Sequence, residues 1–159
     1  MNDPKREILR HIIATVAYRA KKPLTDAPVG FGEFKIGDKT KSPVEILSHM
    51  CDLFEWSLSQ AKGTEFSRGS NLLTWDQEIE RFYRALSDFD EFIAGKESLH
   101  APLENLIQGP VADSLTHVGQ IAMMRRLANS PIRGENFFKA DIRIGRVSKE
   151  QSPPTLEFD

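Results

Sequence analysis

Two side chains of this sequence are spaced so that they could act together on one ion. Asp113 and His117 are the only ionisable residues of the stretch 109–124, and they lie four residues apart. In a helix, this spacing brings the two Cβ atoms to about 5–6 Å, so both side chains can reach one metal ion. Because the stretch is apolar on most sides, we expect a buried helix in which the carboxylate needs a partner. A simple ion pair or hydrogen bond has the same spacing and is the alternative interpretation.

His49 is the candidate third ligand, from the segment 43–62. At 100° per residue, His49 falls at the edge of the apolar face of this segment, where it can point into a cleft between helices. Two imidazoles and one carboxylate would hold an ion by three bonds and leave positions for water or a substrate, as in catalytic metal sites. The alternative for His49 is a histidine at the edge of the core.

The remaining histidines, the methionines and the single cysteine suggest no second site. His11 is expected to be exposed to solvent, and His100 is expected at the surface, in a connection. We expect Met123 and Met124 to fill the core rather than to bind a soft metal ion. Cys51 points away from His49 and is expected to be a buried apolar side chain, and one cysteine excludes an internal disulfide or a cysteine-rich zinc site.

Helices are the elements that must position these residues. Ser42 with Glu45, and Thr74 with Gln77, have the spacing of capping boxes, and apolar residues at three- and four-residue spacing follow. Because no segment alternates with period two for long, the sequence predicts an all-α protein that forms a single domain over residues 1–159. The predicted helices cover residues 4–21, 43–62, 75–94 and 110–128, with a short helical turn around 103–107.

Two segments differ from this helical pattern. Residues 22–42 form a connection of about twenty residues, which is long for a link between helices and indicates a crossover or a lid. Within it, residues 34–36 could pair briefly as a strand. After Pro131 the sequence has no clear periodicity, and we expect this irregular C-terminal tail to wrap around the bundle.

The composition and charge of the chain argue against two classes of partner, nucleic acids and membranes. The chain has 159 residues, of which 40% are hydrophobic and 28% charged, and its net charge is −2. This balance argues against a polybasic nucleic-acid binder, and no uncharged apolar run approaches the ~18 residues of a membrane span. The N-terminal residues lack the apolar stretch of a signal peptide. We therefore expect a cytoplasmic protein with neither nucleic acid nor membrane as its partner.

The sequence resembles the DinB-like, or YfiT-like, superfamily of metal-dependent enzymes. The resemblance rests on residues 43–52 (PVEILSHMCD) and 116–120 (THVGQ), and on the order of the helices. It implies a homodimeric four-helix bundle with a long crossover between the first two helices. It also implies a divalent metal ion held by His49, Asp113 and His117. The superfamily usually has histidine at the position of Asp113, and the carboxylate would favour Zn, Ni, Mn or Fe without choosing among them.

The resemblance also implies a type of reaction. Characterised relatives include transferases and isomerases that use low-molecular-weight thiols such as bacillithiol or mycothiol. The expected function is therefore S-transfer with a thiol of this or the glutathione type, or hydrolysis, on a small-molecule substrate. Asp52 and Gln120 would orient the ligands or the substrate, and Trp56 would form a pocket wall. The alternative is a non-catalytic dimer with a degenerate metal site that acts as a binding or stress-associated scaffold.

Overall fold

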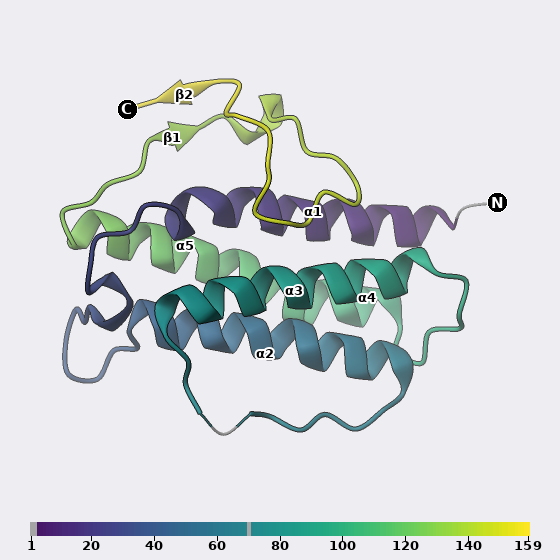
Figure 1. Ribbon diagram of the computed structural model, residues 1–159. Helices are drawn as coiled ribbons and strands as arrows, with labels where there is room; N and C mark the ends of the chain where they lie inside the picture. Colours follow the sequence, from purple (N-terminus) through teal and green to yellow (C-terminus); the bar gives the residue numbers. More distant parts are fainter. Residues whose placement is uncertain (1–2, 70) are drawn as a thin grey trace.

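Helices make up most of the structure, a computed structural model that describes residues 3–69 and 71–159 (Figure 1). The helices are α1 (Pro4–Leu24), α2 (Pro43–Lys62), α3 (Trp75–Ala94), α4 (Leu103–Leu106) and α5 (Ala112–Leu127). Two short strands, β1 (Gly134–Glu135) and β2 (Glu157–Phe158), pair antiparallel in the tail. With so little sheet, the prediction of an all-α protein is confirmed.

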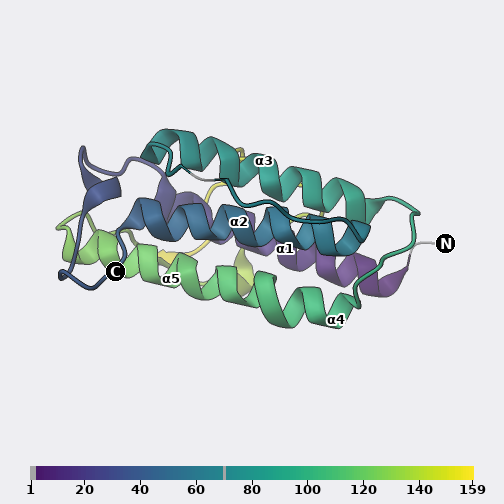
Figure 2. The same ribbon diagram turned by 90° about the horizontal axis from the view of Figure 1, so that it is seen from below.

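The long helices form a bundle in which α1 and α2 occupy opposite corners. Helix α1 packs on both α3 and α5, and so does α2. Helices α3 and α5 therefore occupy the other two corners, between α1 and α2. Figure 2 shows α3 and α5 on opposite sides of α2. Burial of each large apolar side chain between the helices contributes about 1.5–3 kcal/mol. The largest fully buried apolar side chains are those of Leu9, Ile13, Leu47, Met50, Phe54, Phe82, Leu86, Phe89, Ile93, Leu106 and Ile121.

Capping groups determine where α2 and α3 begin. The backbone N–H of Ser42 donates to Oε2 of Glu45 at 2.8 Å, and the N–H of Thr74 donates to Oε1 of Gln77 at 3.1 Å. These bonds satisfy donors that a helix N-terminus would otherwise leave without partners. At the other end, α2 stops at Gly63, whose φ of 70° is the left-handed conformation that glycine adopts most easily.

The predicted end of the first helix, at residue 21, is wrong. The helix continues to Leu24 with Pro23 in its last turn. A proline so close to the C-terminus removes one helical hydrogen bond, and both Pro23 and Leu24 are buried. The carbonyl of Pro23 also accepts a hydrogen bond from Arg125 of α5 at 3.1 Å, which stabilises this last turn.

The predicted helix start at residues 109–110 is also wrong. Helix α4, a π turn at Ile107–Val111 and α5 follow one another without a break. The wider turn accommodates Pro110, which has no N–H to donate, and the hydroxyl of Ser114 donates to the carbonyl of Pro110 at 2.8 Å. A proline that looks like a helix start therefore lies inside one continuous helical segment.

The long connection between α1 and α2 crosses the end of the bundle, as predicted. It includes a 3₁₀ turn, Phe31–Glu33, in which Phe31 is buried with its ring edge-on to Trp75, at 5.4 Å between centroids. This contact attaches the connection to α3. Residues 34–36 pair with no strand in the described part of the chain, so that expectation is wrong.

The tail wraps along α1, as expected from its scattered apolar residues. The buried carboxylate of Glu135 accepts a short hydrogen bond from the hydroxyl of Tyr18 and pairs with Lys22 at 3.0 Å. Farther along the tail, Lys149 pairs with Glu80 of α3 at 3.1 Å. These contacts join residues more than sixty positions apart, so tertiary contacts hold the tail in place.

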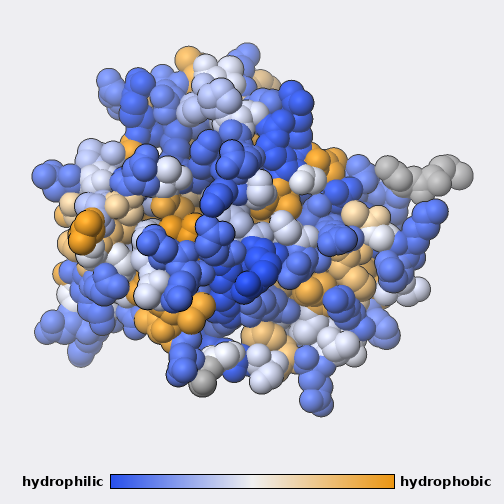
Figure 3. Space-filling view, viewed as in Figure 1, coloured by the Kyte–Doolittle hydropathy of each residue, from blue (hydrophilic) through white to orange (hydrophobic). Residues whose placement is uncertain are grey.

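The surface mixes polar and apolar side chains. In the face shown in Figure 3, apolar residues form separate patches between polar ones. Among helices in residues 3–69 and 71–159, none is both long and apolar enough to pass through a membrane.

Candidate metal centre

The side chains of His49, Asp113 and His117 meet between α2 and α5. Asp113 lies in the first turn of α5, directly after the π turn, and His117 follows one turn later on the same face. His49 faces them from the second turn of α2. One ligand atom from each side chain lies within 4.8 Å of the other two. The three residues predicted from the sequence are therefore brought together.

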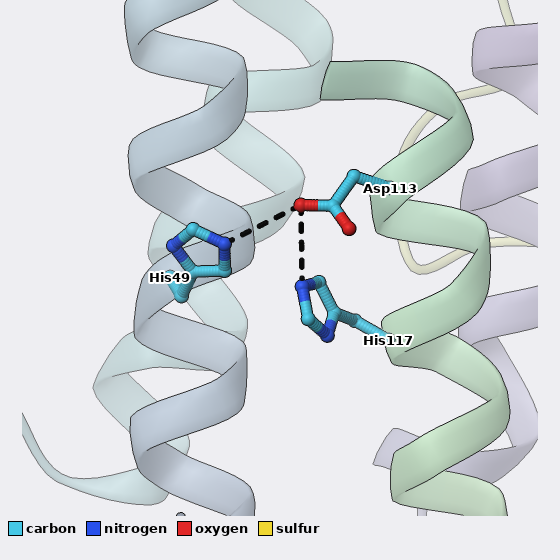
Figure 4. A group of neighbouring side chains, drawn as sticks. All are labelled: His49, Asp113 and His117. Carbon is cyan, nitrogen blue, oxygen red and sulfur yellow. Dashed lines mark ion pairs between the residues drawn. The ribbon is translucent and has the colours of Figure 1, made fainter. Parts of the chain in front are cut away.

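Both imidazoles contact the same carboxylate oxygen. Nε2 of His49 lies 3.5 Å and Nε2 of His117 lies 3.3 Å from Oδ2 of Asp113 (Figure 4). The two rings are nearly perpendicular, with centroids 5.0 Å apart. Such an arrangement directs three ligand atoms toward a common point instead of stacking the rings.

Gln120 contacts the nitrogen of His117 that faces away from the centre. Oε1 of Gln120 lies 2.8 Å from Nδ1 of His117. With this oxygen as acceptor, Nδ1 carries the ring proton, and a neutral imidazole then presents the lone pair of Nε2 toward Asp113. Histidines that bind metal ions are commonly oriented by such a bond to the second nitrogen. A lone pair facing a carboxylate oxygen is unfavourable, so either a metal ion between the two atoms or a second ring proton on Nε2 would stabilise this contact.

The distances fit a metal ion of ordinary size. In a tetrahedral site with metal–ligand bonds of about 2.0–2.1 Å, neighbouring ligand atoms are about 3.3–3.4 Å apart. The two distances from Asp113, 3.5 Å and 3.3 Å, are close to this value. The third pair of ligand atoms lies within 4.8 Å, so the side chains of His49, Asp113 and His117 could hold a divalent metal ion, although their geometry does not distinguish between metals.

The centre is more exposed than the sequence suggests. We expected Asp113 in a buried helix, but α5 buries one face only, and the side chain of Asp113 is 45% exposed. The side chains of His49 and His117 are 33% and 16% exposed. The carboxylate therefore needs no partner on account of burial, and the case for a metal ion rests on the converging ligand atoms.

A cleft of about 520 Å³ opens next to the two imidazoles. The apolar part of its wall comes from Ile36, Ile46, Met123 and Met124, and the polar part from Thr40, Lys41, His49, His117 and Gln120. Ile36, Thr40 and Lys41 belong to the connection between α1 and α2, so the crossover forms one side of the cleft. Its volume is within the range of about 300–1,000 Å³ that is usual for small-molecule sites.

Asp52, which we expected beside His49, lies in a different network. Its carboxylate pairs with Arg81 at 2.6 Å and with Arg68 at 2.5 Å. Arg81 also pairs with Glu55 at 2.5 Å, so these charges join α2 to α3. Asp52 projects toward α3 because two guanidinium groups neutralise its charge there, and it does not orient His49.

Trp56, which we expected as a pocket wall, also lies away from the metal centre, whereas Gln120 contacts His117 there. The indole of Trp56 borders a separate hollow of about 350 Å³, together with His100 and Asn105. Trp56 is two turns along α2 from His49, on the same side of the helix. It therefore lines the groove between α2 and α4 at a point beyond the metal ligands, and not the cleft itself.

Predictions for the other reactive residues agree with the structure. His11 and His100 are exposed, and the ring of His100 lies against Gly63. Cys51 is buried, and burial raises the pKa of its thiol, which donates weakly to the carbonyl of Glu78 at 3.5 Å. A protonated and inaccessible thiol cannot serve as a nucleophile.

The sequence does not predict that Ile36, Lys41, Met123 and Met124 line the cleft. Met123 was expected in the core but is 55% exposed, and Met124, although buried, borders the cleft. Met124 lies seven positions, or about two helical turns, after His117, so their shared face is a usable signal. For Ile36 and Lys41 no such signal exists, because they belong to an irregular connection.

Comparisons of the chain with family models, curated proteins and solved structures found no match.

Proposed function

We propose that this protein is a divalent-metal-dependent enzyme of the DinB-like superfamily that acts on a small molecule, by thiol transfer or by hydrolysis. The observation that carries the proposal is the convergence of two imidazole nitrogens on one oxygen of Asp113, at 3.5 Å and 3.3 Å. The bundle with its diagonal crossover and the resemblance of residues 43–52 and 116–120 to the superfamily add support.

Each residue of the centre would have one role in binding the ion. His49, Asp113 and His117 would hold the ion, and Gln120 would keep Nε2 of His117 directed at it. A bound divalent ion with an open position lowers the pKa of a thiol or water on it, which supplies a nucleophile at neutral pH. The apolar wall beside the imidazoles would keep bulk water away from the electrophile.

Metal analysis of untagged protein tests this proposal. We expect about one divalent ion per chain, lost in the Asp113→Ala and His49→Ala variants and kept in His11→Ala, which removes an exposed histidine elsewhere. Far-UV circular dichroism would check that each variant keeps its helices. Transfer of several low-molecular-weight thiols to a chlorinated aromatic, and ester hydrolysis, should then depend on the ion and stop on chelation. Metal-free protein, or equal metal content in all variants, would overturn the proposal.

A non-catalytic scaffold is the second candidate. It is favoured by the position of Asp113, which is half exposed and 3.3 Å from His117, as in an ordinary ion pair with a protonated imidazole. In that case His117→Ala would lower stability slightly, by up to about 1 kcal/mol, and no variant would affect metal content.

A further inference from the structure

We propose that the cleft beside the metal centre binds a monoanion with an apolar body, such as an aliphatic carboxylate or thiolate, with its charged head at the ion. This inference rests on the proposed function and specifies its substrate class. The cleft residues form the body site, and His49, Asp113 and His117 form the head site.

Charge supports an anionic head. A divalent ion with two neutral imidazoles and one carboxylate carries a net charge of +1. A single negative head group therefore neutralises the centre itself, whereas a cationic head group would be repelled by it.

Lys41 adds a second positive charge at the cleft. It lines the cleft, and no carboxylate is among the cleft residues of the described chain. Lys41 forms no ion pair within residues 3–69 and 71–159, whereas the neighbouring Lys35 pairs with Glu45 at 3.7 Å. Lys41 also borders a neighbouring hollow with Glu45 and Asp52. Because it is ion-paired with neither of them, its ammonium group can attract anions into the cleft and disfavour cations.

The cleft wall supports an apolar body. Ile36 and Met123 are each 55% exposed, although they are large apolar side chains. Ile46 and Met124, which are buried, also line the cleft. Methionine side chains adapt to ligands of different shape, which suits a body of variable length. A ligand that covers Ile36 and Met123 would remove their exposed apolar surface from water.

Titration calorimetry with zinc-loaded protein tests this inference. The probes are butanoate, hexanoate and octanoate, with hexan-1-ol as the uncharged match for hexanoate. We expect the affinity to rise about fourfold per methylene along the acids and hexan-1-ol to bind at least about tenfold more weakly than hexanoate.

Variants of the cleft test which residues recognise the charged head of the ligand and which contact its apolar body. Lys41→Ala should weaken octanoate binding about three- to tenfold and leave hexan-1-ol unchanged, whereas Lys39→Ala, which removes an exposed lysine outside the cleft, should affect neither. Met123→Gln should reduce the gain per methylene without changing the zinc content.

The outcomes separate this inference from the proposed function. One zinc ion per chain with no dependence on acid length, or with equal binding of hexanoate and hexan-1-ol, would overturn the inference and leave the metal centre intact. If the protein binds no zinc but still binds the acids with increasing affinity and depends on Lys41, the cleft assignment holds and the metal-dependent function fails.

Discussion

Nδ1 of His117 lies 2.8 Å from Oε1 of Gln120, three residues further along the same helix. This contact makes Nε2 the nitrogen that faces Asp113 and His49. The orientation of the candidate metal centre therefore depends on a residue that is not itself a ligand, and this dependence can be measured.

Replacing Gln120 by alanine should weaken metal binding by about 10- to 100-fold, because His117 loses the bond that fixes its tautomer and ring orientation. Competition with a chromophoric chelator measures this change. Gln108→Ala, which removes an exposed glutamine from the π turn, is the matched control and should bind metal as the parent protein does. Equal affinity in both variants would contradict the role of Gln120.

Arg125 should stabilise the end of the bundle next to the cleft. Its buried guanidinium donates to the carbonyls of Pro23, Thr25 and Asp26 at 3.1, 2.8 and 3.2 Å, and burial lowers the pKa of Arg125. Loss of these bonds in Arg125→Ala leaves carbonyls without partners and should lower the free energy of unfolding by at least ~2 kcal/mol.

The adjacent Arg126 is the control for this experiment. It is exposed and, within residues 3–69 and 71–159, its side chain bonds only to the carbonyl of Ala122 in its own helix. Arg126→Ala should therefore change stability by no more than about 0.5 kcal/mol. Urea unfolding monitored by circular dichroism gives both values. If the two variants were equally stable, Arg125 would not anchor the end of α1.

Tyr18 should anchor the tail through Glu135. Tyr18→Phe removes a hydrogen bond to the buried carboxylate of Glu135, which then keeps Lys22 as its one side-chain partner among the described residues. The variant should lower the free energy of unfolding by about 1–3 kcal/mol. Tyr83→Phe is the control, since no hydrogen bond of the Tyr83 hydroxyl occurs in the described residues. Limited proteolysis should cut the tail faster in Tyr18→Phe only, and equal cleavage in both variants would argue against this anchor.

Asp141 should make stability fall in acid. Hydrogen bonds from Arg143 at 2.9 Å and Ser152 at 2.7 Å lower the pKa of Asp141 to about 2, from an ordinary value of about 3.9. A lowered pKa means that the ionised group stabilises the folded state above about pH 4, and that this contribution disappears as the pH falls to about 2.

Comparison with Asp141→Asn tests this linkage. The difference in free energy of unfolding between parent and variant should be constant above about pH 5 and should shrink between about pH 4 and 2. Urea titrations across this range measure it. A difference that does not vary with pH would show that the charge of Asp141 plays no part.

Local signals in the sequence determined most of the helical structure. The capping boxes at Ser42 and Thr74 and the glycine at residue 63 mark helix ends correctly, because caps are formed by residues a few positions apart. The proximity of Asp113 and His117 is equally local, since any α-helix brings residues four apart to one face.

Tertiary contacts decided everything that depends on distant partners. Arg125 is buried against the carbonyls at the end of α1, a partner 100 residues away that no local pattern in α5 indicates. Asp52 turns to Arg81 instead of to His49, and α5 exposes the face that its apolar sequence predicted to be buried. Helical periodicity gives the direction of a side chain but not which neighbour lies there.

The metal centre combines both kinds of information. The sequence alone determined that Asp113 and His117 share a face and that His49 lies at the edge of another. Only the tertiary structure decided that α2 and α5 pack with His49 3.5 Å from Asp113, and that the crossover completes the cleft with Ile36 and Lys41. The physical reason is that local hydrogen bonds determine the helices, whereas the packing of their apolar side chains sets the distance and rotation between them.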